Sequence, residues 1–300
     1  MEIRVLRYFL QVAREENMTR AAEQLHITQP TLSRQLAALE EELGVRLFLR
    51  GAGHLRLTPE GVWLRRRAQE IVELCEKTQE ELQLESRAIG GTVSIGSGET
   101  AAFGWLLKGL ETFTKQYPNV QLDLQTGNAE QIREKVYRGL LDLAVLMEPV
   151  DVTPFHSIEI PIGETWGVLM RRDDPLAEKT AITPDILRQT PGHSLILQKR
   201  ETLQSFFENW YGPIDPGQVV AWHDMLANAA HMVHRGLGRV VTIEAAAKQF
   251  MDDTLCFRPL SPALHTKSML VWKKGQPISR ACEKLLDILL AGEEETEKNF

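Results

Sequence analysis

The chain has 300 residues and a mass of 34.0 kDa, more than one ordinary domain holds, so two or three domains are expected. Hydrophobic residues make up 43% and charged residues 25%, which excludes a largely disordered or fibrous chain. Because the net charge is −7, any DNA binding must come from local placement of positive charge.

The cysteines are scattered and form no CxxC pair, so neither a disulfide framework nor a metal site is expected. Apolar runs are shorter than the roughly 18 residues of a membrane span. Charged side chains interrupt the N-terminal segment, which therefore does not read as a signal peptide. We expect a cytoplasmic protein without a membrane partner.

Residues 2–15 are predicted to form an amphipathic helix, because their apolar side chains recur at helical spacing. Asn17 or Thr19 could cap a second helix. A third helix is expected to begin at Thr28 and to end at Gly44. The short connection between the second and third helices is typical of a helix-turn-helix.

The third helix places leucines on one face and polar or basic side chains, Arg34 among them, on the other. Residues 1–58 contain eight arginines, seven glutamates and no lysine. Arginine is well suited to bidentate contacts with guanine or phosphate, and such a helix fits the major groove. A small helical bundle with a solvated polar face fits the same spacing, so spacing alone leaves both interpretations open.

Residues 45–61 predict a β-hairpin, in which leucines alternate on both sides of a Gly51-Ala52-Gly53 turn. Arg50 and Arg56 flank the tip of this hairpin, where a wing would meet the DNA backbone or minor groove. Thr58, followed by a proline, is expected to open a further helix.

The run FLQVAREENMTRAAEQLHITQPTLSRQLAALEEELGVRLFLR, followed by LTPEG, resembles the winged helix-turn-helix of LysR-type transcriptional regulators. Many family members have a second basic residue in the wing near position 53, where this chain has Gly53, and His54 or Arg56 could replace it. The resemblance, together with the position of Arg56 in the hairpin, implies DNA contacts at Gln29, Pro30, Thr31, Ser33, Arg34, Arg50 and Arg56.

The segment from Pro59 to Ala88 predicts one long helix. Its apolar residues alternate in steps of four and three, as in a two-stranded coiled coil. The resemblance implies that this helix pairs with a second copy, and its weak seam leaves homodimer and homotetramer open. The residues of the expected seam are Leu64, Ala68, Ile71, Cys75, Thr78 and Leu82.

The rest of the chain alternates strands and helices, which predicts a parallel sheet with helices on both faces. In such sheets ligands bind beyond the carboxyl ends of the strands. The expected strands are 92–95, 120–124 and 142–146, the helices run over 101–116 and up to Arg138, and the loops at the binding edge are 97–100, 126–128 and 147–149.

The segments LDLAVL, RRDDPLAEK and MVHRGLGRVV resemble the effector domain of the same family, which has the two-lobed fold of periplasmic substrate-binding proteins. The expected fold is therefore an α+β multidomain protein. It comprises a winged helix-turn-helix at 1–58, a linker helix at 59–90 and an effector-binding domain at 91–300, with lobe I at 91–160 plus 267–300 and lobe II at 162–265.

The resemblance places an effector pocket between the lobes. Each polar residue expected there could equally serve as a loop residue or helix cap. Glu99 and Glu148 would repel a carboxylate, so we hypothesise that the effector carries an amine, hydroxyls or a metal-like charge besides, or instead of, an acid group. The expected lining is Ser97, Gly98, Glu99, Thr100, Thr126, Asn128, Glu148, Gln198, Arg200, Thr202 and His223.

No GxSxG, HExxH or Walker A motif is present, so no catalytic residue is predicted. A stand-alone substrate-binding protein or an enzyme on the same fold would leave the first 58 residues without a role. We expect a sequence-specific transcriptional regulator that binds double-stranded DNA as a homo-oligomer. A small-molecule effector, bound non-covalently and without a further cofactor, would control it, and RNA polymerase is a further candidate partner.

Overall fold

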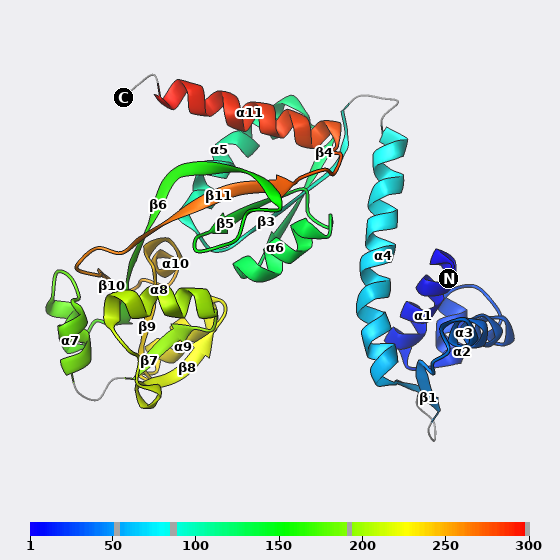
Figure 1. The fold of residues 1–300 in the computed structure, drawn as a ribbon, viewed down its shortest axis with the longest axis horizontal. Coiled ribbons are helices and arrows are strands. Elements are labelled where there is room, and N and C mark those ends of the chain that lie inside the picture. Colours follow the sequence, from blue (N-terminus) through cyan, green and yellow to red (C-terminus); the bar gives the residue numbers. More distant parts are fainter. Residues whose placement is uncertain (51–54, 85–88, 191–193, 298–300) are drawn as a thin grey trace. The chain divides into compact units, whose positions relative to one another are not determined.

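The computed structural model describes residues 1–50, 55–84, 89–190 and 194–297 and divides into two compact units, Met1–Ser86 and Arg87–Phe300 (Figure 1). The predicted hairpin tip, with Gly53 and His54, lies outside the described residues.

The N-terminal unit is a winged helix-turn-helix followed by a long helix, as the sequence predicts. The Asn17 side chain caps α2 by accepting hydrogen bonds from the amides of Thr19 and Arg20, at 2.9 and 3.1 Å. Gly44 ends α3 with a left-handed backbone, φ 68°. The elements are α1 (Ile3–Glu15), α2 (Met18–Gln24), α3 (Gln29–Leu43), β1 (Phe48–Arg50), β2 (Leu55–Leu57) and α4 (Pro59–Leu84).

The long helix α4 contributes to the core of its own unit. Leu64, Ala68 and Val72 are buried together with residues of α1, α2 and α3. Two positions of the expected coiled-coil seam, Leu64 and Ala68, are thus used within the chain. Another seam position, Ile71, is 38% exposed in the single chain.

The C-terminal unit contains two lobes joined by two strands. In the described part of the chain the strand order is β4-β3-β5-β11-β6-β9-β7-β8, and β10 also pairs with β6. The elements are β3 (Gly91–Ser97), α5 (Ala101–Gln116), β4 (Val120–Thr126), α6 (Ala129–Tyr137), β5 (Leu143–Met147), β6 (Phe155–Arg171), η1 (Pro175–Glu178), α7 (Pro184–Gln189), β7 (Leu195–Gln198), α8 (Glu201–Tyr211), η2 (Pro216–Gln218), β8 (Val219–His223), α9 (Leu226–His234), β9 (Arg239–Ile243), α10 (Glu244–Lys248), β10 (Leu255–Pro259), β11 (His265–Lys273) and α11 (Arg280–Glu297).

Both lobes combine parallel and antiparallel pairing. Strand β3 runs parallel to β4 and β5, and β7 runs parallel to β8 and β9, as the strand–helix alternation predicts. The crossover strands β6 and β11 run antiparallel to each other and to their other neighbours, so the sheet is mixed rather than wholly parallel. Strand β6 leaves β11 after Thr165 and pairs with β9 from Trp166, which marks the passage between the lobes.

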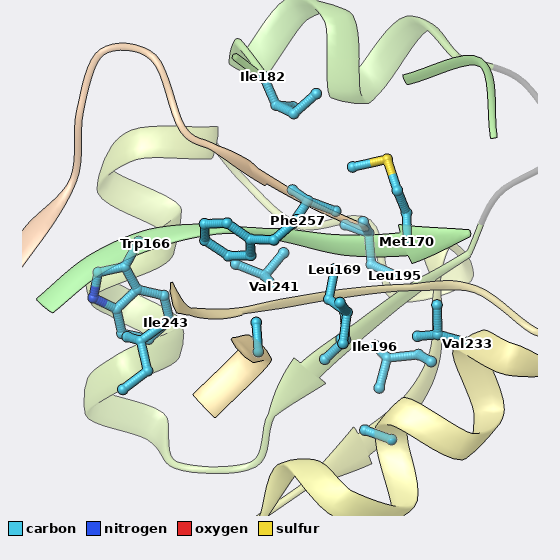
Figure 2. Close-up of a cluster of buried hydrophobic side chains, with 14 of the residues drawn as sticks. Trp166, Leu169, Met170, Ile182, Leu195, Ile196, Val233, Val241, Ile243 and Phe257 are labelled. Atoms are coloured by element: carbon cyan, nitrogen blue, oxygen red, sulfur yellow. The ribbon is translucent and has the colours of Figure 1, made fainter. Parts of the chain in front are cut away.

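Each lobe has its own hydrophobic core. The core of lobe II gathers side chains of β6, β7, β9 and β10 with those of the surrounding helices. Figure 2 shows Trp166 and Ile243 of this cluster side by side on neighbouring strands. The lobe I core includes Leu270 of β11 and Leu285 of α11, so it depends on the C-terminal part of the chain.

Candidate functional site

Helix α3 presents a polar surface because its leucines are buried on the opposite face. Leu32, Leu36 and Leu39 have exposed fractions of 3% or less. On the other face the predicted DNA-contacting residues Gln29, Pro30 and Arg34 are exposed, while Thr31 and Ser33 are half-buried. The structure therefore brings these five residues together on one helix face.

The start of α3 differs in one detail from the predicted cap. Thr28 is the N-cap residue, but its hydroxyl lies 2.8 Å from the Thr31 hydroxyl instead of capping a backbone amide. The Arg34 Nε donates to the Pro30 carbonyl at 3.4 Å, and no carboxylate pairs with Arg34 among the described residues. Its guanidinium is therefore available to a ligand.

The wing is held against α3 by a residue that sequence analysis missed. The carboxylate of Glu40 accepts hydrogen bonds from the amides of Leu47 and Phe48, at 2.7 and 3.2 Å, and from Arg46 at 3.0 Å. Of the predicted wing contacts, Arg56 is exposed on β2 and Arg50 is the last residue of β1.

The C-terminal unit contains an open cleft. Its volume is about 650 Å³, which includes space open to the solvent. Predicted residues that line it are Gly98, Glu99, Thr100, Asn128, Gln198 and Arg200. Most of the remaining lining was not predicted from the sequence; it comprises Gly127, Ala129, Val145, Met147, Trp166, Leu203, Asp224, Met225, Leu226, Thr242, Ile243 and Ala246.

The other predicted pocket residues do not line this cleft. Ser97 is buried at the end of β3, and its hydroxyl donates to the Gly98 carbonyl at 2.9 Å. Thr126 is the exposed last residue of β4, which continues two residues beyond the expected strand. Glu148 is exposed and does not line the cleft, so it does not join Glu99 there as the hypothesis about the effector's charge assumes. Asp224 lines the cleft with Glu99 instead.

Thr202 and His223 lie next to lining residues rather than among them. The Thr202 hydroxyl accepts a hydrogen bond from Arg200 Nε at 2.8 Å. The His223 imidazole is buried, with Nδ1 3.3 Å from the Met225 carbonyl oxygen. Burial lowers the pKa of this imidazole and outweighs the opposing effect of its contact with Met225.

Two charged side chains make contacts across the cleft. Arg200 of lobe II, with a side-chain exposure of 8%, donates through Nη2 to the Pro149 carbonyl of lobe I, and its Nε lies 3.8 Å from a carboxylate oxygen of Glu130. In the opposite direction, Glu99 of lobe I accepts a hydrogen bond from the amide of Leu226 at the start of α9, at 3.4 Å. Residues that line the cleft therefore join the two lobes directly through these contacts.

The cleft can bind a ligand that has both apolar and polar parts. Its walls are largely apolar, and helices α5, α6 and α9 begin at its rim, where backbone amides favour hydrogen-bond acceptors. Within the described residues, no group of three histidine, cysteine, aspartate or glutamate side chains is placed to hold a metal ion. No helix in the described part is long and apolar enough to cross a bilayer.

Comparison with known proteins agrees with this architecture. The family described as "LysR substrate binding domain" matches residues 86–293, and "Bacterial regulatory helix-turn-helix protein, lysR family" matches residues 3–62. The chain is 32% identical over 289 residues to the HTH-type transcriptional regulator YybE of Bacillus subtilis, covering 94% of this chain and 96% of YybE. It is 31% identical over 282 residues to the Hca operon transcriptional activator HcaR of Escherichia coli, covering 92% and 93%.

Solved structures share the fold over nearly the whole chain. The crystal structure of full-length CbnR complexed with its target DNA matches with a TM-score of 0.74 and 19% identity, covering 97% of this chain and 99% of CbnR. Full-length OxyR from Pseudomonas aeruginosa matches with a TM-score of 0.55 and 26% identity, covering 96% and 99%.

A winged helix-turn-helix joined to a two-lobed ligand-binding domain defines a ligand-responsive DNA-binding regulator. This chain belongs to the LysR family of transcriptional regulators. It is a DNA-binding transcriptional regulator with an effector-binding domain, and its relatives are regulators rather than enzymes, as the sequence predicts.

Proposed function

We propose that the exposed face of α3 reads operator DNA in the major groove. The observation that supports this role is the polar face formed by Gln29, Pro30, Thr31, Ser33 and Arg34, opposite the buried side chains of Leu32, Leu36 and Leu39. Thr31, Ser33 and Arg34 would contact base edges, and Pro30 would lie against a thymine methyl group. Gln29 would contact a base or a phosphate, and Arg50 and Arg56 would hold the wing on the backbone.

The protein would act as a homodimer or homotetramer in the cytoplasm, where its DNA target lies. Two recognition helices of a dimer would enter successive major grooves about 34 Å apart. The exposed apolar residues Val62, Trp63, Ile71 and Leu74 of α4 support pairing with a second copy. Contact with RNA polymerase at the promoter belongs to the same proposal.

The DNA-binding role is tested by selecting genomic fragments with the purified full-length protein at about 150 mM salt, because phosphate contacts alone give non-specific retention at low salt. We expect an inverted repeat upstream of a few operons. Retention that shows no sequence preference would contradict the proposal.

The second part of the proposal is that a small-molecule effector binds non-covalently, without a further cofactor, in the cleft between the lobes. Gly98, Glu99, Thr100 and Asn128 would contact it from lobe I, and Gln198 and Arg200 from lobe II. The contacts of Glu99 and Arg200 across the cleft would change when it binds, which would alter the lobe arrangement and the placement of the DNA-binding domains.

Calorimetry with metabolites of the genes next to the operator tests the cleft. Ala246→Phe adds bulk at a lining position and should weaken binding of the identified compound more than tenfold. Ala291→Phe makes the same change at an exposed position of α11 and should have no effect. Equal affinities for both variants would place the effector elsewhere.

A further inference from the structure

The cleft between the lobes is lined by charges of opposite sign. Glu99 and Asp224 contribute carboxylates, and Arg200 is the one basic lining residue in the described part of the chain. Among the described residues no ion pair joins Arg200 to either of these carboxylates; the acid that it contacts is Glu130. The cleft therefore keeps opposite charges apart, and a ligand that carries both signs could join them.

The two carboxylates meet at the start of helix α9. Glu99 Oε2 accepts a hydrogen bond from the amide of Leu226 at 3.4 Å, and Asp224 Oδ1 accepts one from the amide of Met225 at 3.0 Å. Because these two amides are consecutive along the chain, the carboxylate of lobe I and that of lobe II lie at the same place in the cleft.

This part of the cleft has more acceptors than donors. The second oxygen of Glu99 and that of Asp224 make no hydrogen bond with the described residues. Thr100 also lines the cleft, and its hydroxyl oxygen is buried without a partner in the described part of the chain. We call Glu99, Thr100 and Asp224 the acceptor group. Its three side chains match the three N–H donors of an ammonium group, whose charge would offset the repulsion between the carboxylates.

Arg200 offers the complementary contact for an acid group. Its Nη2 donates to the Pro149 carbonyl, its Nε donates to the Thr202 hydroxyl at 2.8 Å, and its Nη1 makes no hydrogen bond within the described residues. The Glu130 side chain is 65% exposed and 3.8 Å away, so solvent screens this pair. Burial lowers the pKa of Arg200, but an arginine keeps its proton in proteins. The free Nη1 can therefore donate a charge-assisted hydrogen bond to a carboxylate.

An apolar hollow adjoins the cleft within lobe II. Its volume is about 240 Å³, which includes space open to the solvent. The Trp166 indole, fixed by a hydrogen bond from Nε1 to the Thr266 hydroxyl at 3.1 Å, borders both the hollow and the cleft. A space of this size and lining suits a short aliphatic group. The hollow shares Trp166, Gln198 and Leu203 with the cleft, and Leu197, Gln204, Phe207 and Val241 complete it.

We propose that the effector of this regulator is an α-amino acid with an aliphatic side chain. Its ammonium group binds to the acceptor group, its carboxylate binds to Arg200, and its side chain enters the hollow beside Trp166. This inference rests on the proposed binding of an effector in the cleft and names the chemical class of that effector. Because Glu99 belongs to lobe I and Arg200 to lobe II, such a ligand holds the two lobes together.

The test compares L-leucine with matched analogues by NMR titration of the full-length protein. Isocaproate lacks the amine of leucine, isoamylamine lacks the acid group, and glycine lacks the side chain. We expect leucine to bind roughly tenfold more tightly than each of the three, because each analogue loses either a charge-assisted contact or the apolar burial. Equal affinities for leucine and isocaproate would overturn the inference.

A variant locates the ammonium group. Asp224→Asn keeps an oxygen that accepts from Met225 and removes the negative charge. It should weaken leucine binding roughly tenfold without weakening isocaproate, which has no ammonium group. The matched control is Asp215→Asn, which makes the same change at an exposed aspartate that accepts from the Gly217 amide at 2.9 Å and does not line the cleft. It should leave both affinities unchanged.

Glu99→Gln makes the same change on lobe I and should give the same pattern, so the test does not depend on the folding of one variant. Equal losses for leucine and isocaproate in both cleft variants would overturn the inference. No detectable binding of alanine, valine, leucine or isoleucine to the wild type would overturn it as well.

These outcomes are separate from that of the proposed function. If the compound identified from the genes beside the operator loses affinity in Ala246→Phe while no amino acid binds, the cleft remains the effector site. Only the chemical class assigned to the effector then fails.

Discussion

Arg34 is exposed on the polar face of α3, where its guanidinium has no carboxylate partner among the described residues. Arg34→Ala should cost about 1–3 kcal/mol in binding to the operator and much less in binding to random duplex, because a base contact carries sequence information. Fluorescence anisotropy with both duplexes at one salt concentration measures this difference.

Two further variants serve as comparisons for Arg34→Ala. Arg14→Ala removes an exposed arginine at the end of α1 and should change neither affinity appreciably. Arg56→Ala on the wing should weaken binding to both duplexes alike, because it is expected to contact the backbone. Equal losses on both duplexes for Arg34→Ala would refute its role in reading bases.

His223 gives the effector-binding domain a pH-dependent stability. Burial lowers its pKa, so the unfolded chain binds more protons than the folded one at pH values between the lowered pKa and the ordinary value of about 6.5. The stability that the neutral, buried imidazole contributes is fully present above pH 6.5. It is lost as the pH falls from 6.5 through the lowered pKa. The free energy of unfolding of His223→Asn should therefore fall less than that of the wild type between pH 7.5 and pH 5. Urea denaturation followed by circular dichroism measures both. An equal fall in the two proteins would contradict this assignment.

At the scale of elements, two helix glycines should respond oppositely to alanine. A Cβ on Gly61, in the first turn of α4, would lie 2.2 Å from the Leu47 carbonyl oxygen, so α4 and the wing would have to move apart. A Cβ on Gly104, in α5, would meet no atom within 4 Å in the described part of the chain. Gly61→Ala should destabilise the N-terminal unit by about 1–3 kcal/mol, and Gly104→Ala should stabilise its own unit by about 0.4–1 kcal/mol.

Differential scanning calorimetry of the two full-length variants checks this pair, and each serves as the control for the other. The unfolding transition of the N-terminal unit should shift down in Gly61→Ala, with little change in the other unit. A stabilising effect of Gly61→Ala would mean that the close approach of α4 to the wing is not maintained in solution.

Elements set by local chemistry could be predicted from the sequence. Helix α5 has the expected bounds, 101–116, and Asn17 caps α2 as one of two candidates, because periodicity and capping act over a few residues. Strand β4 extends to Thr126 because pairing with β3, a non-local interaction, continues to that position. Such pairing cannot be predicted from the local sequence pattern.

The same distinction applies to the cleft. The polar lining residues in the loops before α5 and α6 could be predicted, because loop positions next to helix starts can be recognised in the sequence. Apolar lining residues such as Trp166 and Ile243 have the sequence pattern of any buried strand. They reach the cleft because β6 crosses between the lobes and pairs with β9 there. Glu40 was missed because its partners include the backbone amides of Leu47 and Phe48, which leave no side-chain motif in the sequence.

At the scale of the whole molecule, effector and operator binding should influence each other equally. Coupling free energies of this kind are typically about 1–3 kcal/mol, a change of roughly 5–150-fold in affinity. Titrating the identified effector into the free protein and into its operator complex should give the same factor as titrating operator with and without effector. Unequal factors would show that a third equilibrium, such as oligomer assembly, takes part.

The two strands that join the lobes also set an order of events during synthesis. Lobe II lies in one continuous stretch of chain after Trp166, whereas lobe I is completed only when β11 has inserted between β5 and β6 and α11 has joined its core. On the ribosome, the lobe begun first must therefore wait for β11 and α11, which are translated after the whole of lobe II, while lobe II itself can fold earlier. A nascent chain stalled before β11 should thus hold a folded lobe II beside an unfinished lobe I, so the cleft is assembled only after β11 and α11 have joined lobe I.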